Sequence, residues 1–459
     1  MNRLLKGALA TLGGAVAVEG VRRMVSSGGR HRYEPWERAP YTEFPKKILI
    51  IGGGFAGYNA AEKLCRLARD RDDVGVMLVS RENYFTFWPM LASVVGGDVQ
   101  TRNVAQPLRR TLIRLGSSFR RAELEGVDPE RRTVTAGGKE FPYDHLILSL
   151  GAEPAYFGIP GVEEHCISIR GIGAGEDIVD RVIERYEETT LAGGEVPDSK
   201  LTFVVIGGGA TGVEIASELH NLVRELVVPD YPNVDPNRVR IVLIDRGEHI
   251  LKELDPALRR VARKKLHDLH VEVLTEVSAK EVTADRVILA DGREVLSENV
   301  IWTAGARASA KLDDLPFPSD ERRGLEVDAF QRVAGYGNVW GIGDCAATVD
   351  ERTGPVPPNA QAAVQEGEAV AGNVLAAIDG RELEPFRYRG VGQLVEMGSE
   401  FAVNEVMGIK FSGFAASLFW RLTYLYKLES PQSRARIAAD WLLDLFYEPA
   451  VTQIREERF

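Results

Sequence analysis

The chain has 459 residues, of which 44% are hydrophobic and 27% charged, and its net charge is -11. This composition is typical of a folded protein of two or three domains and excludes a largely disordered chain. The acidic balance, without a long basic run, argues against nucleic acid as a partner. Three scattered cysteines exclude a disulfide framework, and no metal site is expected, which indicates a reduced, cytoplasmic setting.

Residues 1–45 read as an N-terminal extension that ends in a charged, proline-punctuated linker. Its apolar run from Ala8 to Val18 is shorter than the ~20 residues that a membrane-spanning helix needs. No convincing cleavage site follows the run, which argues against a secretory signal. Two alternatives stay open for it, a helix lying at a membrane surface and a disordered segment.

The first ordered element predicted is a strand from Lys47 to Ile51 that leads directly into a glycine turn. Gly52, Gly54 and Gly57 follow at the spacing of a dinucleotide-binding turn. Such a turn needs one glycine for the tight bend, one for close approach to a pyrophosphate and one for helix packing. The helix predicted from Tyr58 to Arg69 would present its N-terminus to the phosphates.

The next strand, Val74 to Val79, is followed by Ser80 at the place where an acid usually binds the ribose of the dinucleotide. Either Ser80 binds the ribose as a neutral partner or Glu82 bends back to it, and the sequence leaves both open. A further apolar strand, 143–151, ends at Gly151, where a small-residue turn has room for the edge of a cofactor; a buried strand would read identically.

The glycine turn occurs a second time. A buried strand from Phe203 to Ile206 leads into Gly207, Gly209 and Gly212, so the sequence predicts two dinucleotide sites. The following strand ends in Asp245, which is placed to bind both hydroxyls of an adenine ribose and to repel a 2′-phosphate. This favours NADH over NADPH, although the neighbouring Arg246 weakens the preference.

Short strand-like runs follow at 271–274, 286–289 and 300–303, and the last of them leads into Ala304 and Gly305. The strand in 338–347 closes with Gly343 and Asp344. This aspartate is placed to bind a ribityl hydroxyl of a flavin, or to act as a helix N-cap, and the two roles are compatible.

The helix predicted after Asp344 carries Gln361 and Gln365 on one face, because residues four apart are neighbours on a helix. The tail continues with aromatic and basic residues from Ile409 to Leu428, and with a second amphipathic segment from Arg434 to Tyr447. Helices of this kind lie in the interface of a lipid bilayer. A dimer interface or a domain core would use the same apolar faces and remains an alternative.

Taken together, these motifs resemble the type II NADH:quinone oxidoreductases, members of the pyridine nucleotide-disulfide oxidoreductase-like flavoproteins that bind FAD and NAD(P). The resemblance covers nearly everything from residue 46 onward and rests on short stretches: NYF at 83–85, GGGATGVE at 207–214, WTAG at 302–305, GDCA at 343–346 and AQAAVQ at 360–365. Two positions depart from the family pattern. Ser80 replaces an acid, and Glu366 stands where many members have a second glutamine.

The resemblance implies an α/β fold with two Rossmann-like dinucleotide-binding domains, the FAD domain being interrupted by the NAD domain, and a C-terminal amphipathic helical region that docks on membranes. The expected FAD-binding domain comprises 46–160 and 326–385. The NADH-binding domain would be 161–325, and the membrane-docking or dimer region 386–459.

The implied activity is that of a non-proton-pumping NADH:quinone oxidoreductase, which passes hydride from NADH to FAD and two electrons onward to a membrane quinone. A homodimer is expected, peripheral on the cytoplasmic side of the cell membrane. The residues expected at FAD are Gly52, Gly54, Phe55, Ala56, Gly57, Ser80, Arg81, Asn83, Gly151, Gly343, Asp344 and Gln361. Those expected at NADH are Gly207, Gly209, Thr211, Gly212, Glu214, Asp245, Ala304 and Gly305.

Three residues are expected to take part in the reaction. Glu214 would lie near the nicotinamide and assist proton movement, while Gln361 and Gln365 would lie beside the quinone. Two rival functions stay open: a sulfide:quinone oxidoreductase, whose chemistry needs paired reactive cysteines, and a flavoprotein of the apoptosis-inducing-factor type that turns over slowly.

Overall fold

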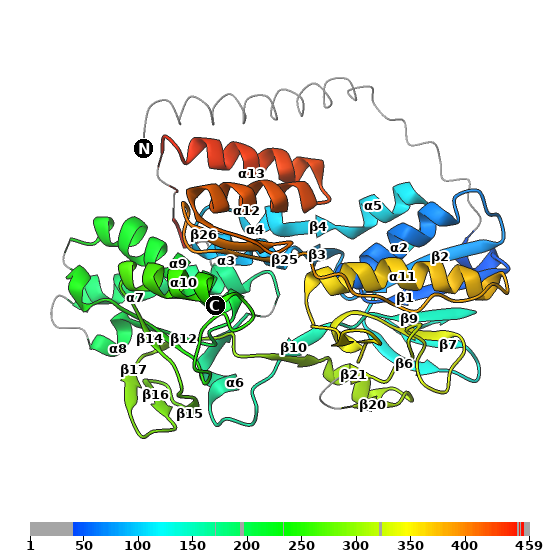
Figure 1. The fold of residues 1–459 in the computed structure, drawn as a ribbon, viewed down its shortest axis with the longest axis horizontal. Coiled ribbons are helices and arrows are strands. Elements are labelled where there is room, and N and C mark those ends of the chain that lie inside the picture. Colours follow the sequence, from blue (N-terminus) through cyan, green and yellow to red (C-terminus); the bar gives the residue numbers. More distant parts are fainter. Residues whose placement is uncertain are drawn as a thin grey trace.

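The computed structural model describes residues 40–169, 171–192, 197–232, 234–320, 324–447, 449 and 451–453. The apolar run predicted near the N-terminus lies outside these residues. The described chain forms two sheet-based domains that lie side by side, with two C-terminal helices across one face of the pair (Figure 1).

The first domain is built on a parallel five-stranded sheet of order β22-β9-β1-β2-β5. The last four residues of its central strand, Ile48–Ile51, are apolar and buried, as expected of a strand covered on both faces. The strands are β1 (Lys46–Ile51), β2 (Val74–Ser80), β5 (Ser118–Arg121), β9 (His145–Leu148) and β22 (Val339–Gly341). An antiparallel sheet lies on one side of it: β6 (Leu124–Asp128), β7 (Thr133–Ala136) and β8 (Lys139–Pro142).

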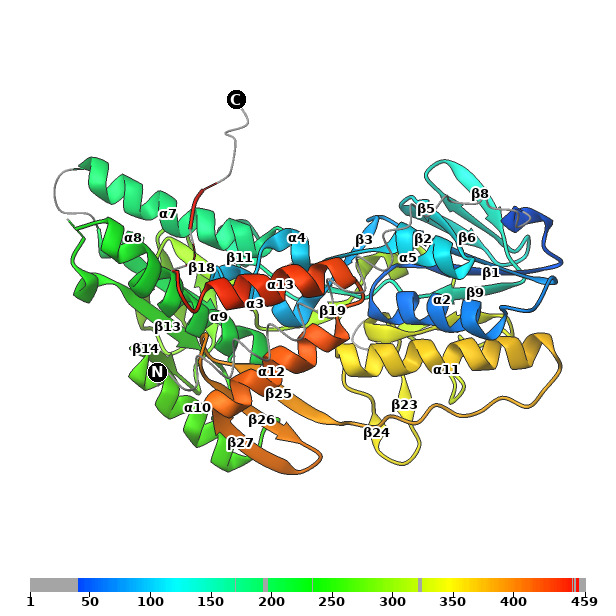
Figure 2. The ribbon, with the colours of Figure 1, turned by 90° about the horizontal axis from the view of Figure 1, so that it is seen from above.

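Helices α2 (Phe55–Leu67) and α11 (Ala360–Ile378) pack against each other along this domain, although some 300 residues separate them in sequence (Figure 2). Gly367 allows their close approach, because a Cβ at that position would lie 2.3 Å from the carbonyl oxygen of Ala56. The remaining elements of this domain are η1 (Tyr41–Glu43), β3 (Tyr84–Thr86), η2 (Trp88–Met90), α3 (Leu91–Val95), α4 (Thr101–Val104), β4 (Ala105–Pro107), α5 (Leu108–Leu115), β20 (Ser319–Asp320), β21 (Gly324–Leu325), η7 (Gly343–Cys345), β23 (Val349–Asp350) and β24 (Gly354–Pro355).

The second domain repeats the plan with a parallel sheet of order β11-β18-β12-β13-β14. Its strands are β11 (Cys166–Ser168), β12 (Thr202–Ile206), β13 (Arg240–Ile244), β14 (Val271–Leu274) and β18 (Asn299–Trp302). An antiparallel sheet is attached: β15 (Ala279–Val282), β16 (Arg286–Leu289) and β17 (Glu294–Leu296). Its helices are α6 (Val162–His165), α7 (Ala174–Ala192), α8 (Asp198–Leu201), α9 (Ala210–His220), η3 (Asn221–Val227), η4 (Val228–Asp230), η5 (Pro236–Arg238) and α10 (Pro256–Asp268). The turn η6 (Ala310–Asp314) belongs to the first domain, because its Leu312 packs in the core of that domain.

A two-stranded ribbon joins the domains: β10 (Ala152–Pro154) runs out of the first domain and pairs antiparallel with β19 (Ala306–Ala308), which returns to it. The chain therefore interrupts the first domain with the second. Two parallel sheets of this kind confirm the α/β, Rossmann-like fold class that the glycine turns predict.

The C-terminal region contains a three-stranded antiparallel sheet, β25 (Gly392–Glu396), β26 (Ala402–Val406) and β27 (Ile409–Gly413), followed by α12 (Phe414–Lys427) and α13 (Pro431–Leu443). The prediction of one helix from Ile409 was wrong, because the first five residues pair with β26 as a strand. Gly413, at φ +90°, makes the turn from strand to helix in a conformation that only glycine adopts easily.

The two C-terminal helices are amphipathic. Trp420 of α12 and Ile437 of α13 are fully buried in the core of the first domain, and Tyr424 makes an edge contact with Phe87. The opposite face of α12 exposes Phe419, Leu422 and Tyr426. Within the described part of the chain, no helix combines the length and the apolarity needed to cross a bilayer.

Candidate functional site

The first glycine turn follows β1. Gly52 has φ +102°, and a Cβ there would lie 2.0 Å from the carbonyl oxygen of Ser149, so only glycine fits. A Cβ at Gly57 would lie 2.0 Å from the carbonyl oxygen of Gly52, which is the close helix–strand contact expected of the third glycine. A Cβ at Gly54 would meet no atom within 4 Å. The second glycine therefore faces open space, as close approach of a pyrophosphate requires.

The second turn repeats this geometry after β12. Gly207 has φ +121°, and a Cβ at Gly212 would lie 1.8 Å from the carbonyl oxygen of Gly207. Gly209, like Gly54, faces open space. The hydroxyl of Thr303 donates to the carbonyl oxygens of Ile206 and Gly207, which ties the end of β18 to the turn. Both turns thus fit a dinucleotide lying on a helix N-terminus.

Ser80, the last residue of β2, and Asp245, the residue after β13, occupy matching positions in the two domains. Asp245 accepts the backbone N–H of Gly208 and of Gly247, both at 2.6 Å. Ser80 lies at the other turn in the same way, with its hydroxyl oxygen 2.9 Å from where a Cβ of Gly53 would stand. Glu82 pairs instead with the exposed Arg81 at 3.5 Å. The geometry favours Ser80 over Glu82 at the ribose of the first dinucleotide.

Asp344 lies in the single turn η7, after β22. The alternative reading of Asp344 as a helix N-cap was wrong, because α11 begins at Ala360 and its cap is Asn359, whose side chain accepts the N–H of Ala362. Burial raises the pKa of Asp344. Its neighbour Glu366, on α11, accepts the N–H of Gly343 and holds this turn against the helix.

Gln361 and Gln365 share one face of α11, as predicted, and both bind backbone. The Gln361 amide donates to the carbonyl oxygen of Gly392 at 2.8 Å and accepts from Val391 at 3.1 Å. Gln365 makes the same pair of hydrogen bonds with Arg389, at 3.0 and 2.9 Å. The two side chains therefore fix segment 389–392, which leads into β25, alongside the helix.

Glu214 lies in the second turn of α9, and its carboxylate accepts the N–H of Glu396 at 3.2 Å. Burial raises the pKa of Glu214 well above its ordinary value. Near it lie charged residues from distant elements: Asp98, Glu218, Glu396 and Arg421. The sequence did not single out the three acidic residues, and Arg421 is one of the basic residues of the tail predicted to face lipid. The spacing of Glu214 and Glu218 on one face of an apolar helix was the available signal.

The other predicted site residues fall around the two turns. Phe55 and Ala56 begin α2, Thr211 is exposed at the start of α9, and Ala304 packs against Gly207. Gly151, at φ +68°, opens the connecting ribbon, and Gly305 lies beside the ring of Phe157. Arg81 and Asn83 are exposed at the end of β2. None of these placements tests the assigned roles, which stay predictions.

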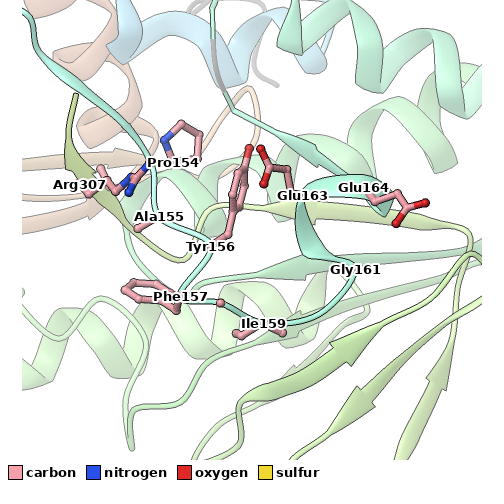
Figure 3. A pocket seen from close by; sticks show the side chains of 11 residues that line it. Pro154, Ala155, Tyr156, Phe157, Ile159, Gly161, Glu163, Glu164 and Arg307 are labelled. Atoms are coloured by element: carbon pink, nitrogen blue, oxygen red, sulfur yellow. The ribbon is translucent and has the colours of Figure 1, made fainter. Parts of the chain in front are cut away.

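A hollow of about 1020 Å³ opens where the ribbon enters the second domain, lined by Tyr156, Phe157, Ile159, Glu163 and Arg307 among others (Figure 3). The guanidinium of Arg246, next to Asp245, lies 5.9 Å from the centre of the Phe157 ring. The hollow therefore borders the second glycine turn but does not contain it.

The three cysteines form no disulfide. Cys65 and Cys345 are buried, and burial raises the pKa of the half-buried Cys166 thiol to about 12. A thiol with so high a pKa is a poor nucleophile at neutral pH. These cysteines do not supply the reactive pair that sulfide oxidation needs.

Comparison with known proteins matches residues 46–367 to the pyridine nucleotide-disulphide oxidoreductase family. The chain is 31% identical to an internal alternative NAD(P)H-ubiquinone oxidoreductase of Arabidopsis thaliana mitochondria, over 91% of this chain and 87% of that protein. It is 30% identical to a demethylphylloquinone reductase of Synechocystis, over 87% and 96% of the two chains. The structure of NDH2 from Plasmodium falciparum in complex with NADH has the same fold, with a TM-score of 0.80 at 20% identity, over 89% of this chain and all of that one. The chain therefore belongs to the pyridine nucleotide-disulphide oxidoreductase family, among its alternative, type II NADH:quinone oxidoreductases.

Proposed function

We propose that the protein oxidises NADH with the help of bound FAD and reduces a membrane quinone. The observation that carries the proposal is the pair of glycine turns, each with its second glycine, Gly54 or Gly209, open to a pyrophosphate. Two such turns in two interlocked domains suit one resident and one exchanging dinucleotide. Bound FAD supplies the two-electron chemistry that links a hydride donor to a quinone.

Different side chains would bind the two cofactors. The turn after β1, together with Ser80 and Asp344, would hold FAD, and the turn after β12 would hold NADH. Asp245 would bind the adenine ribose and disfavour a 2′-phosphate, since two negative charges would then be brought together. Glu214 would lie at the nicotinamide, in a position to hold or release a proton.

The quinone would bind where α11 meets segment 389–392. Gln361 and Gln365 hold this segment through both ends of their amides. We infer that the two glutamines shape one wall of the quinone site. The proposed division of the chain is 46–160 and 326–385 for FAD, 161–325 for NADH and 386–459 for docking.

The outer face of α12 and α13 is the proposed docking surface on the bilayer, on the cytoplasmic side, so that a lipid-soluble quinone reaches the flavin without crossing water. A homodimer is part of the same proposal. The exposed apolar side chains of these helices and of the turn after α13 support the docking surface: Phe414, Phe419, Leu422, Tyr426, Leu443, Phe446 and Tyr447.

Anaerobic rapid mixing tests the proposed reaction in two steps. Mixing the FAD-loaded protein with NADH should bleach the flavin absorbance, and mixing the reduced protein with a short-chain quinone should restore it at a rate that supports turnover. Flavin that is reduced by NADH but not reoxidised by quinone would point to the slowly cycling flavoprotein class. A flavin that NADH does not reduce would contradict the proposal at its first step.

A further inference from the structure

Phe157 has an unusual conformation in the loop that leads from the connecting ribbon into the second domain. It is not a glycine, yet its φ is +53°, and its large apolar side chain is 59% exposed. Both features cost free energy, because an L-residue is strained in the left-handed region and an apolar ring is more stable when buried. Strain of this kind at the edge of a binding site points to a role in function.

The loop around Phe157 is fixed to the end of β18. The N–H of Ala155 donates to the carbonyl oxygen of Gly305 at 3.1 Å, and the carbonyl oxygen of Ala155 accepts from the indole N–H of Trp302 at 3.0 Å. Gly305 also leaves room for the ring, because a Cβ there would lie 2.9 Å from Cζ of Phe157. The ring points out of the loop, on the side away from Glu163 (Figure 3). The framework therefore holds the Phe157 ring at the carboxyl end of β18.

The ring contacts Arg246, the residue after Asp245. The Arg246 guanidinium lies over the Phe157 ring, 5.9 Å from its centre, which is within the range of a cation–π contact. Asp245 directs its two carboxylate oxygens to the N–H groups of Gly208 and Gly247. Within the described part of the chain, Arg246 forms no ion pair. The Phe157 ring is therefore the contact that orients this guanidinium.

The contact between Arg246 and Phe157 joins the two strands that flank the second glycine turn. Strand β12, which leads into this turn, pairs with β13 on one side and with β18 on the other. Arg246 follows β13, whereas Phe157 packs at the end of β18. The Arg246 side chain is thus drawn from the end of β13, where the adenine ribose is expected, toward the end of β18.

We propose that Phe157 strengthens the preference for NADH by holding the Arg246 guanidinium away from the 2′ position of the adenine ribose. The inference rests on the proposed binding of NADH at the second glycine turn. An arginine next to the ribose-binding acid accommodates the 2′-phosphate of NADPH when it is free to reach it, and the ring removes this compensation. A 2′-phosphate then meets the carboxylate of Asp245 without a cation beside it, and the like charges repel.

The variant Phe157→Leu tests this role, because leucine keeps an apolar side chain but has no ring face to attract a cation. The ratio of kcat/KM for NADPH to kcat/KM for NADH should rise about two- to fivefold, the size of one exposed cation–π contact. Ferricyanide serves as the electron acceptor, so that quinone binding does not affect the ratio. Calorimetric titration of the FAD-loaded protein with NADP+ and NAD+, neither of which reduces the flavin, should show the ratio of the Kd for NADP+ to the Kd for NAD+ falling by the same factor.

Further variants separate this role from a structural one. In the double variant Phe157→Leu with Arg246→Gln the gain should disappear, since no guanidinium is left to release. Phe157→Tyr keeps the ring and should keep the wild-type ratio. The matched control is Phe330→Leu, because Arg332 lies over the Phe330 ring at 5.4 Å in the first domain, and the loss of that ring should not change the ratio. Phe157→Gly, which also relieves the positive φ, repeats the test if Phe157→Leu does not retain FAD.

An unchanged ratio in Phe157→Leu would overturn the inference, as would a wild-type protein that uses NADPH as well as NADH. A gain that persists in the double variant would also overturn it, because the ring itself would then exclude the 2′-phosphate. Equal losses for both nucleotides would make Phe157 part of the binding surface or of the fold instead. Each of these results leaves the proposed function intact. If the wild-type protein binds no NAD+ and NADH does not reduce its flavin, the proposed function falls, and the role of Phe157 falls with it.

Discussion

A methyl group added at Gly54 or Gly209 would contact no other atom of the protein, whereas one added at the other glycines of the two turns would clash. Neither would clash with the protein, and both residues have φ near -75°, which alanine adopts without strain. An added Cβ would instead stand where each pyrophosphate must approach. These two positions therefore separate cofactor binding from folding.

We expect Gly54→Ala to lose FAD, and Gly209→Ala to keep FAD while its KM for NADH rises by about tenfold or more, equivalent to about 1.4 kcal/mol. The ratio of FAD to protein after gel filtration, and steady-state kinetics with ferricyanide, measure the two effects. Gly57→Ala is the contrasting variant, because its Cβ would strike the carbonyl oxygen of Gly52 and should lower stability. Loss of FAD from Gly209→Ala, with FAD kept by Gly54→Ala, would reverse the assignment of the two sites.

At the scale of single residues, sequence reasoning found what local spacing encodes and missed what tertiary packing brings together. The glycine turns and Asp245 lie next to their strands in sequence, so their positions could be predicted. The choice between Ser80 and Glu82 depends on how a loop turns, which spacing does not determine. Asp98, Glu396 and Arg421 could not be found, because each reads as a surface charge until three distant elements meet.

Helix α11 also carries a buried acidic residue, Glu366. Its Glu366 is 3% exposed, accepts the N–H of Gly343 and lies near the carboxyl group of Asp344. Burial raises the pKa of Glu366 from 4.5 to about 7. In the folded protein this carboxyl group therefore keeps its proton over a pH range in which the unfolded chain has already released it.

This difference predicts how stability depends on pH. Between pH 4.5 and about 7 the folded state binds one more proton at Glu366 than the unfolded state, so the contribution of Glu366 to the free energy of unfolding decreases as the pH rises and levels off above 7. The loss is at most about 3 kcal/mol. Thermal melts of the FAD-saturated protein should show Glu366→Gln gaining stability relative to the wild type from pH 5 to pH 8.

Other buried carboxyl groups titrate in the same range, so the comparison is made between variants rather than within one melt series. Glu368→Gln, an exposed change on the same helix, is the control and should run parallel to the wild type. Parallel curves for Glu366→Gln as well would show that the Glu366 carboxyl group is ionised throughout, against the raised pKa.

At the scale of elements, the strands of both parallel sheets could be predicted because buried parallel strands are short apolar runs. The start of α12 could not be predicted in this way. Residues Ile409–Gly413 have the apolar and basic pattern of an interfacial helix, yet they pair with β26, because the neighbouring strand offers hydrogen bonds that an isolated helix turn does not. The basic residues of this tail were expected to face lipid. Arg421 does not, because the same packing places it in ion pairs with Asp98 and Glu396.

For the molecule as a whole, the question is what covers the outer face of α12. Leu422 and Tyr426 are 53% and 79% exposed there. Helix α12 lies beside α13 on one side of the molecule (Figure 1). Lys427 and Arg434 lie close by, over the rings of Tyr424 and Tyr426. Apolar side chains with adjacent cations suit the interface of an anionic bilayer.

We expect Leu422→Glu to weaken binding to anionic vesicles by about tenfold or more, since inserting a leucine contributes about 1.5 to 3 kcal/mol and the new carboxylate would be repelled. Vesicle co-sedimentation at moderate salt measures the loss, and ferricyanide turnover should not change, because Leu422 lies on the outer face, away from both glycine turns. The control is Leu296→Glu, at a leucine of β17 in the second domain that is 45% exposed, which should leave vesicle binding intact. If Leu422→Glu keeps full vesicle binding and instead changes the molar mass in solution, this face joins two copies of the chain and does not dock on lipid.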